Sequence, residues 1–125
     1  MKLTPAILKN LYSAIYCMKP FDRWAMPLPE QINFIVDKDP QVMGTYLYDD
    51  GEKWEHTITI SSARCGHLDT VMRVLCHECI HMSRHKTSKW THHDKEFRSR
   101  AHRISSELGF DPLELKCYPY GYYRQ

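Results

Sequence analysis

Near the middle of the chain, the stretch CHECIHM contains two overlapping patterns of metal-binding residues. His77, Glu78 and His81 form a His-Glu-x-x-His pattern, while Cys76 and Cys79 form a Cys-x-x-Cys pattern. A helix turns by about 100° per residue, so a rigid helix cannot direct all of these side chains at one ion. Whichever pattern binds a metal, the other must face elsewhere, and this restricts how the segment can pack.

Periodic apolar residues predict that this stretch lies in a helix over residues 70–82, with Asp69 as its N-cap. On that helix the two histidines share one face, with the glutamate beside them, because residues four apart lie one turn apart. The cysteines fall on the opposite face with the apolar residues, where a free thiol packs as a small hydrophobic group. We therefore predict that His77 and His81 are metal ligands and that Glu78 is available for chemistry.

Two other interpretations of the stretch stay open. The histidines can be ordinary polar residues on a half-exposed helix. Alternatively, the cysteines can belong to a structural zinc site with Cys65 and Cys117, although a helical pair that faces the core suits such a site poorly. The cysteine count of 5 is odd and the residues are scattered, which argues against a disulfide framework and for a reducing, cytoplasmic location.

The first part of the chain predicts a helix over residues 3–18, with Thr4 as N-cap and Pro5 in the first turn. Lys9 and other polar residues interrupt its apolar face, and no small-residue cleavage site follows. We therefore expect an amphipathic helix rather than a signal peptide. No apolar run is long enough to span a bilayer, and we expect no membrane association.

Three strands are expected next, at residues 32–37, 44–51 and 53–61. The Asp-Asp-Gly turn after the second leaves too little chain for a crossover, so the second and third should form an antiparallel hairpin. We expect a three-stranded, mainly antiparallel sheet. The residues expected on one face of the third strand are Trp54, His56, Ile58 and Ile60.

A last helix is expected to begin at His93 or Asp94, to bury Phe97 and to end at Gly109. The resulting order, one helix, three strands and two helices, predicts an α+β fold. The length of 125 residues is that of one domain, so we expect a single domain over residues 1–125 and a monomer.

A catalytic zinc needs a third protein ligand and an open position for water. The start of the last helix is the natural source, because an element that crosses the first helix gives better tetrahedral geometry than His85, which lies at or past the end of that helix. His93 is our candidate, and its neighbour His92 stays a rival. The other downstream residues that can serve are Asp94, Glu96, His102 and Glu107.

The segment from Val74 to Asp111 resembles the active-site region of the SprT-like (Spartan-type) zinc metalloproteases. That family has His-Glu-x-x-His on one helix and His-Gly-x-x-Phe at the start of the next. Here His93 and Phe97 match the second pattern, while Asp94 replaces the usual glycine. The resemblance covers about residues 30–111, and the four-cysteine zinc ribbon that follows in many relatives is absent from this sequence.

The resemblance implies a zincin-like fold and one catalytic Zn²⁺ held by His77, His81 and His93. Glu78 would be the general base that takes a proton from the zinc-activated water and passes it to the leaving amine. Substrate would bind in extended form along residues 44–49 or 54–60. A tyrosine of the tail could be a second oxyanion donor, although such residues more often pack: Tyr118, Tyr120, Tyr122 and Tyr123.

The resemblance also implies substrates that are proteins on DNA, and a nucleoid or nuclear location in that case. The net charge of +2 does not imply nucleic acid by itself, but basic residues outnumber acids over residues 84–103 and are compatible with phosphate contacts. The alternative function is a non-catalytic, zinc-stabilised module that binds nucleic acid. The basic residues are Arg84, Lys86, Lys89, Lys95, Arg98, Arg100 and Arg103.

Overall fold

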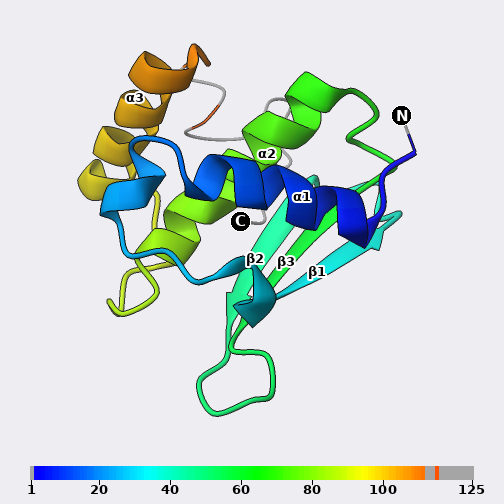
Figure 1. Cartoon of the computed structure of the whole chain (residues 1–125), viewed down its shortest axis with the longest axis horizontal. Helices are drawn as coiled ribbons and strands as arrows, with labels where there is room; N and C mark the ends of the chain where they lie inside the picture. Colours follow the sequence, from blue (N-terminus) through cyan, green and yellow to red (C-terminus); the bar gives the residue numbers. More distant parts are fainter. Residues whose placement is uncertain (1, 112–114, 116–125) are drawn as a thin grey trace.

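A three-stranded sheet and three α-helices make up the part of the chain that this computed structural model describes, residues 2–111 and Leu115 (Figure 1). The α+β class is confirmed. The proline-rich stretch between the first helix and the first strand forms two short 3-10 turns. The elements are α1 (Pro5–Tyr16), η1 (Phe21–Arg23), η2 (Pro29–Gln31), β1 (Ile32–Asp37), β2 (Gly44–Tyr48), β3 (His56–Ser61), α2 (Leu68–Ser83) and α3 (Lys95–Leu108).

The sheet has the strand order β1-β3-β2, with β3 in the centre. β2 and β3 are antiparallel, which confirms the predicted hairpin, whereas β1 and β3 are parallel. The expectation of a mainly antiparallel sheet is therefore wrong, and the sheet is mixed. After β1 the short connection over residues 38–43 sends the chain back along the far edge. β3 then enters between the first two strands and runs in the direction of β1.

The β2–β3 hairpin has a longer loop than the sequence predicted. Gly44 pairs with Ile60 at one end and Tyr48 with His56 at the other. Beyond that end the Asp49 N–H donates to the Glu55 carbonyl at 2.9 Å. Trp54 therefore lies in the loop, half-exposed, and not on the strand face where it was expected, whereas His56, Ile58 and Ile60 are buried as predicted.

One face of the sheet carries the core, and α1 and α2 cover it (Figure 1). The buried positions of β1 and β3 alternate, as a half-buried sheet requires. α1 begins as predicted, because Thr4 accepts a hydrogen bond from the Ile7 N–H and Pro5 follows it. Tyr12 of α1 packs against Phe34 of β1 with ring centroids 5.7 Å apart. On the covered face, α1 therefore packs directly against β1, the strand that follows it in the chain.

α2 starts earlier than predicted, because His67 and not Asp69 is the N-cap. Asp69 lies in the first turn, where its charge favours the helix N-terminus and where it pairs with Arg73 at 3.9 Å. The last helix follows the prediction more closely. Asp94 caps α3, and Gly109 ends it in the left-handed region with φ 86°. Among the described helices, none has the length and apolar content needed to cross a membrane.

Candidate metal centre

The middle of α2 is buried on every side, so both faces of the CHECIHM stretch are covered. Cys76 and Cys79 pack in the hydrophobic core between α2 and the sheet, as predicted. His77, Glu78 and His81 are also fully buried, on the opposite side. The helix can bury so many polar groups only if they find partners, because an unpaired buried polar group costs about 1–3 kcal/mol.

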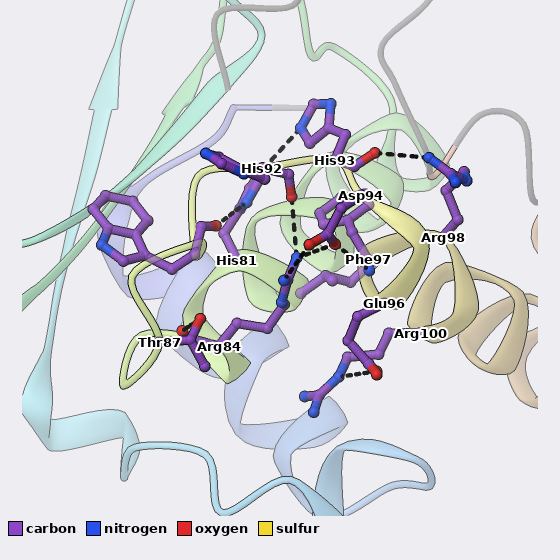
Figure 2. A network of polar contacts seen from close by, with 12 residues as sticks. His81, Arg84, Thr87, His92, His93, Asp94, Glu96, Phe97, Arg98 and Arg100 are labelled. Atoms are coloured by element: carbon purple, nitrogen blue, oxygen red, sulfur yellow. Dashed lines mark hydrogen bonds and ion pairs between the residues drawn. The ribbon is translucent and has the colours of Figure 1, made fainter.

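His93, the residue just before the N-cap of α3, brings a third imidazole to the two on α2. Figure 2 shows it beside His81. One nitrogen from each ring lies within 4.8 Å of the others. Nε2 of His81 and Nε2 of His93 are 3.1 Å apart. The ring centroids form a nearly equilateral triangle with sides of 5.1, 5.0 and 4.9 Å. Helix α2 and the segment that precedes α3 thus bring three imidazoles to one place.

Backbone carbonyl groups fix the orientation of both helix histidines. Nδ1 of His77 donates to the Leu115 carbonyl oxygen at 2.6 Å, and Nδ1 of His81 donates to that of Trp90 at 2.7 Å. A ring that donates from Nδ1 presents the lone pair of Nε2, the tautomer that a metal needs. Both carbonyl groups come from outside α2, so segments on either side of α3 set the ring positions.

The ring of Phe97 packs against all three imidazoles. This side chain is fully buried, and its ring centroid lies 5.0, 4.8 and 4.6 Å from those of His77, His81 and His93. Phe97 is on the first turn of α3, four residues after His93. The residue that the sequence identified as a packing partner therefore contacts all three rings.

The donor set fits zinc. Three imidazole nitrogens are a common protein ligand set for catalytic Zn²⁺, and metal–nitrogen distances of about 2.0–2.1 Å in tetrahedral geometry imply nitrogens about 3.3 Å apart. The 3.1 Å between the Nε2 atoms of His81 and His93 is close to that spacing. A cation between facing nitrogen lone pairs also removes their mutual repulsion. The three histidines can therefore hold a metal ion.

Glu78 follows His77 in the sequence and is buried, and neither oxygen of its carboxyl group has a hydrogen-bond partner within the part of the chain that the structure describes. Burial raises the pKa of Glu78 well above its usual value, because the charged form loses its hydration. A buried carboxyl group without hydrogen-bond partners lowers the stability of the folded protein. A bound cation with a water molecule would supply both a compensating charge and a hydrogen-bond donor.

The other candidate ligands lie outside the group. His92 is exposed, and His85 points into a different cluster, where its ring is 5.0 Å from that of Tyr48 and 4.7 Å from that of His56. Burial raises the pKa of the Cys76 thiol to about 12, so that it stays protonated. Within the described residues no further group of three potential ligands is found. The tail tyrosines and Cys117 lie outside the described residues.

Sequence reasoning missed three contributors to the site. The carbonyl groups of Trp90 and Leu115 leave no signal in the side-chain pattern, because any residue offers a carbonyl. Arg84 was grouped with the basic residues that could contact phosphates but is buried, and it forms an ion pair with Asp94. Asp94 stands where the SprT-like pattern usually has glycine, and this acidic residue was the one available signal that a basic partner would lie nearby.

Comparison with known proteins identifies a family. The model of the SprT-like family matches residues 20–118, which include every residue of the candidate centre. No curated protein and no solved structure gives a significant match to the chain.

Proposed function

The chain belongs to the SprT-like family, and on that premise we propose that it is a zinc-dependent endopeptidase with a zincin-like active site. His77, His81 and His93 are the proposed ligands, and Glu78 is the proposed general base. The geometry supports the ligand assignment, because the three rings converge, whereas His92 is exposed and lies outside the group. A metalloprotease-type domain is what the family suggests, and the specific reaction is our proposal.

The burial of Glu78 is the observation that carries the proposal. A zinc ion with a purely structural role needs four ligands and gains nothing from a carboxyl group beside them. Hydrolysis needs a base there. Glu78 shares a turn of α2 with both histidines, is fully buried, and its two oxygens lack hydrogen-bond partners among the described residues. This arrangement is unfavourable for stability and suited to proton transfer.

When bound, zinc supplies a Lewis acid that activates a water molecule and polarises the peptide carbonyl. Glu78 accepts the proton of the attacking water and then gives it to the leaving amine. A raised pKa assists the first transfer, because the carboxylate of a weaker acid is a stronger base, and a bound cation would keep the group ionised so that it can accept the proton. The carbonyl groups of Trp90 and Leu115 hold the rings of His81 and His77 in place throughout.

The substrate is proposed to bind as an added strand on β2. Of the two segments considered from the sequence, β3 is excluded, because it pairs on both sides. β2 is an edge strand, packs on α2 and exposes Leu47 at its outer face. An extended peptide on this edge would gain backbone hydrogen bonds. His93 is the one ligand that is only half-buried, so the scissile bond would approach from its side.

Association with DNA is a second, weaker part of the proposal. Arg84 and Arg100 are used inside the protein, in ion pairs with Asp94 and Glu96, and are less available to phosphates than the sequence suggested. The exposed cations of the segment remain, and they are Lys86, Lys89, Lys95, Arg98 and Arg103. We propose a cytoplasmic protein that is nucleoid-bound or nuclear when it engages DNA. Equal affinity for DNA after Lys86, Lys89 and Lys95 are replaced by Gln would end this part of the proposal.

The test of the peptidase uses variants that separate metal binding from hydrolysis. We would measure bound zinc and cleavage of casein for the parent, Glu78→Ala, His93→Ala and His92→Ala. Glu78→Ala should keep the metal and lose cleavage by about 10²–10⁴-fold, because a general base contributes about that much. His93→Ala should lose most of the metal.

His92→Ala is the matched control, since it removes the adjacent imidazole without touching the group of three. It should retain both zinc and activity. Cleavage by Glu78→Ala at the parental rate would contradict the mechanism. Loss of zinc in His92→Ala but not in His93→Ala would shift the third ligand by one residue. Zinc bound by the parent and lost in His93→Ala, with no cleavage by the parent, would favour the non-catalytic nucleic-acid-binding module.

A further inference from the structure

Arg84 is a buried arginine at the end of α2, three residues after His81. Its side chain is only 6% exposed, which is rare for arginine unless it is paired. The guanidinium forms a two-pronged ion pair with Asp94, in which Nη1 lies 2.8 Å from Oδ1 and Nη2 lies 2.8 Å from Oδ2. Nη1 also donates to the carbonyl oxygen of His92 at 3.1 Å. Such paired, charge-assisted hydrogen bonds are strong and fix geometry.

The two partners of Arg84 are the residues on either side of His93, as Figure 2 shows. Asp94 also caps α3, because its Oδ1 accepts a hydrogen bond from the Phe97 N–H at 3.1 Å. The backbone before His93 and the helix start after it are therefore both held by one guanidinium. That guanidinium is attached to α2, the helix that carries the other two histidines.

This arrangement addresses a difficulty in the geometry of the centre. His77 and His81 keep their spacing automatically, because both are on one helix. His93 comes from the segment that follows, and its place relative to them depends on whatever joins that segment to α2. A misplacement of about 1 Å is large for a metal site, in which ligand distances hold to within about 0.2 Å.

We propose that Arg84 is a positioning residue of the metal centre, which sets His93 relative to His77 and His81 by holding His92 and Asp94 to the end of α2. The inference rests on the proposed metal site and adds to it a residue that touches neither metal nor substrate. It assigns to the pair of Arg84 and Asp94 a role in metal affinity, beyond any part in holding the two helices together.

A purely structural role is the competing explanation, and Arg100 provides the matched control. Arg100 also joins the two helices, because Nη1 on α3 donates to Oγ of Ser83 on α2 at 2.8 Å. It pairs with Glu96 at 3.0 Å and its guanidinium lies 4.8 Å from the Trp24 ring centroid. None of these partners is next to a histidine of the centre. Loss of Arg100 should therefore weaken helix packing without moving a ligand.

The experiment measures zinc affinity of the full chain by competition with a chromophoric chelator, for Arg84→Met and Arg100→Met. Circular dichroism gives the melting temperature of each, so that affinity is compared where both are folded. We expect Arg84→Met to bind zinc about 10-fold more weakly than the parent, the lower end of the range for groups that orient ligands. Arg100→Met should stay within about threefold of the parent while its melting temperature falls. The visible spectrum of the Co²⁺ form should change in Arg84→Met only, since it reports ligand geometry.

A folded Arg84→Met with parental zinc affinity and an unchanged Co²⁺ spectrum would overturn the inference. Should Arg84→Met fail to fold, Arg84→Lys decides, because lysine keeps the charge but cannot hold His92 and both oxygens of Asp94 at once. It should bind zinc more weakly, and parental affinity would again overturn the inference. Adding Asp94→Asn to the weakened Arg84 variant should cause little further loss, since the two act as one unit. A parent that binds no zinc would instead overturn the proposed function.

Discussion

His81 on α2 and Trp90 in the following loop are joined by a hydrogen bond, in which Nδ1 of the imidazole lies 2.7 Å from the Trp90 carbonyl oxygen. The indole of Trp90 is held in turn, because it packs edge-on against the buried ring of Tyr46 with centroids 5.4 Å apart. A residue of the β2 edge strand thereby fixes the loop that orients a proposed ligand. Trp90 thus adds a connection between the sheet and the candidate metal centre to the one that α2 makes by packing on the sheet.

Removing the indole should loosen the loop and weaken the centre. We predict that Trp90→Ala lowers zinc affinity by about 10-fold, because the carbonyl that orients His81 loses its anchor. Trp90→Phe keeps a ring against Tyr46 and should retain most of the affinity. Chelator competition provides the measurement, and Trp54→Ala is the control, since Trp54 lies half-exposed in the hairpin loop. Parental zinc affinity in Trp90→Ala would show that the loop needs no anchor.

His56 should make folding sensitive to acid. Burial, with a smaller contribution from the charge of nearby His85, lowers the pKa of His56 from 6.5 to about 4. The unfolded chain therefore binds a proton in this range that the folded protein rejects, and stability falls as the pH drops from about 6.5 towards 4. The loss attributable to His56 should be about 2–3 kcal/mol.

Urea unfolding at several pH values would measure this dependence. His56→Gln should flatten the profile over the same range, because the amide does not titrate there. The amide can replace Nδ1 in the hydrogen bond with the Tyr46 hydroxyl, whose atoms lie 2.7 Å apart. His102→Gln, which removes an exposed histidine from α3, controls for the loss of one imidazole. An acid profile unchanged by His56→Gln would mean that other groups cause the loss.

Gly44 sets how closely α2 approaches β2. A Cβ at this position would lie 2.7 Å from Cγ1 of Val74 and 3.1 Å from both Cδ1 of Ile60 and the Thr59 carbonyl oxygen. Valine in a helix has one strongly preferred rotamer, so it cannot turn aside at low cost. Gly44→Ala should destabilise the protein by about 1–3 kcal/mol in chemical denaturation. Gly66→Ala, where nothing lies within 4 Å of the new Cβ, should change stability by less than about 0.5 kcal/mol. A Gly44→Ala variant as stable as the parent would mean that α2 moves away from β2 without cost.

The elements that local chemistry specifies could be predicted from the sequence, and their arrangement could not. Thr4, Pro5 and Gly109 marked helix ends correctly, because capping depends on the residue itself and its near neighbours. The parallel pairing of β1 with β3 was missed, since a strand carries no mark of which partner lies beside it. The start of α2 was placed too late because Asp69 suits the first turn as well as the cap.

The candidate site shows the same division. Helical spacing alone put His77 and His81 on one face and the two thiols on the other, and the structure agrees. Convergence of His93 on that face depends on how two helices cross, which the resemblance implied and spacing alone did not decide. The hydrogen bond from His77 to the Leu115 carbonyl oxygen joins residues far apart in the chain. Such contacts follow from tertiary packing, and no local pattern announces them.

The back-to-back placement of thiols and imidazoles on α2 has a consequence for the order in which folding and metal loading can occur. In the folded protein the core keeps Cys76 and Cys79 away from the proposed metal site. In the unfolded chain nothing does, and thiolates compete strongly with imidazoles for zinc. Metal present too early would therefore be captured by the wrong atoms and would favour the unfolded chain. The protein should assemble its core first and acquire its ion afterwards.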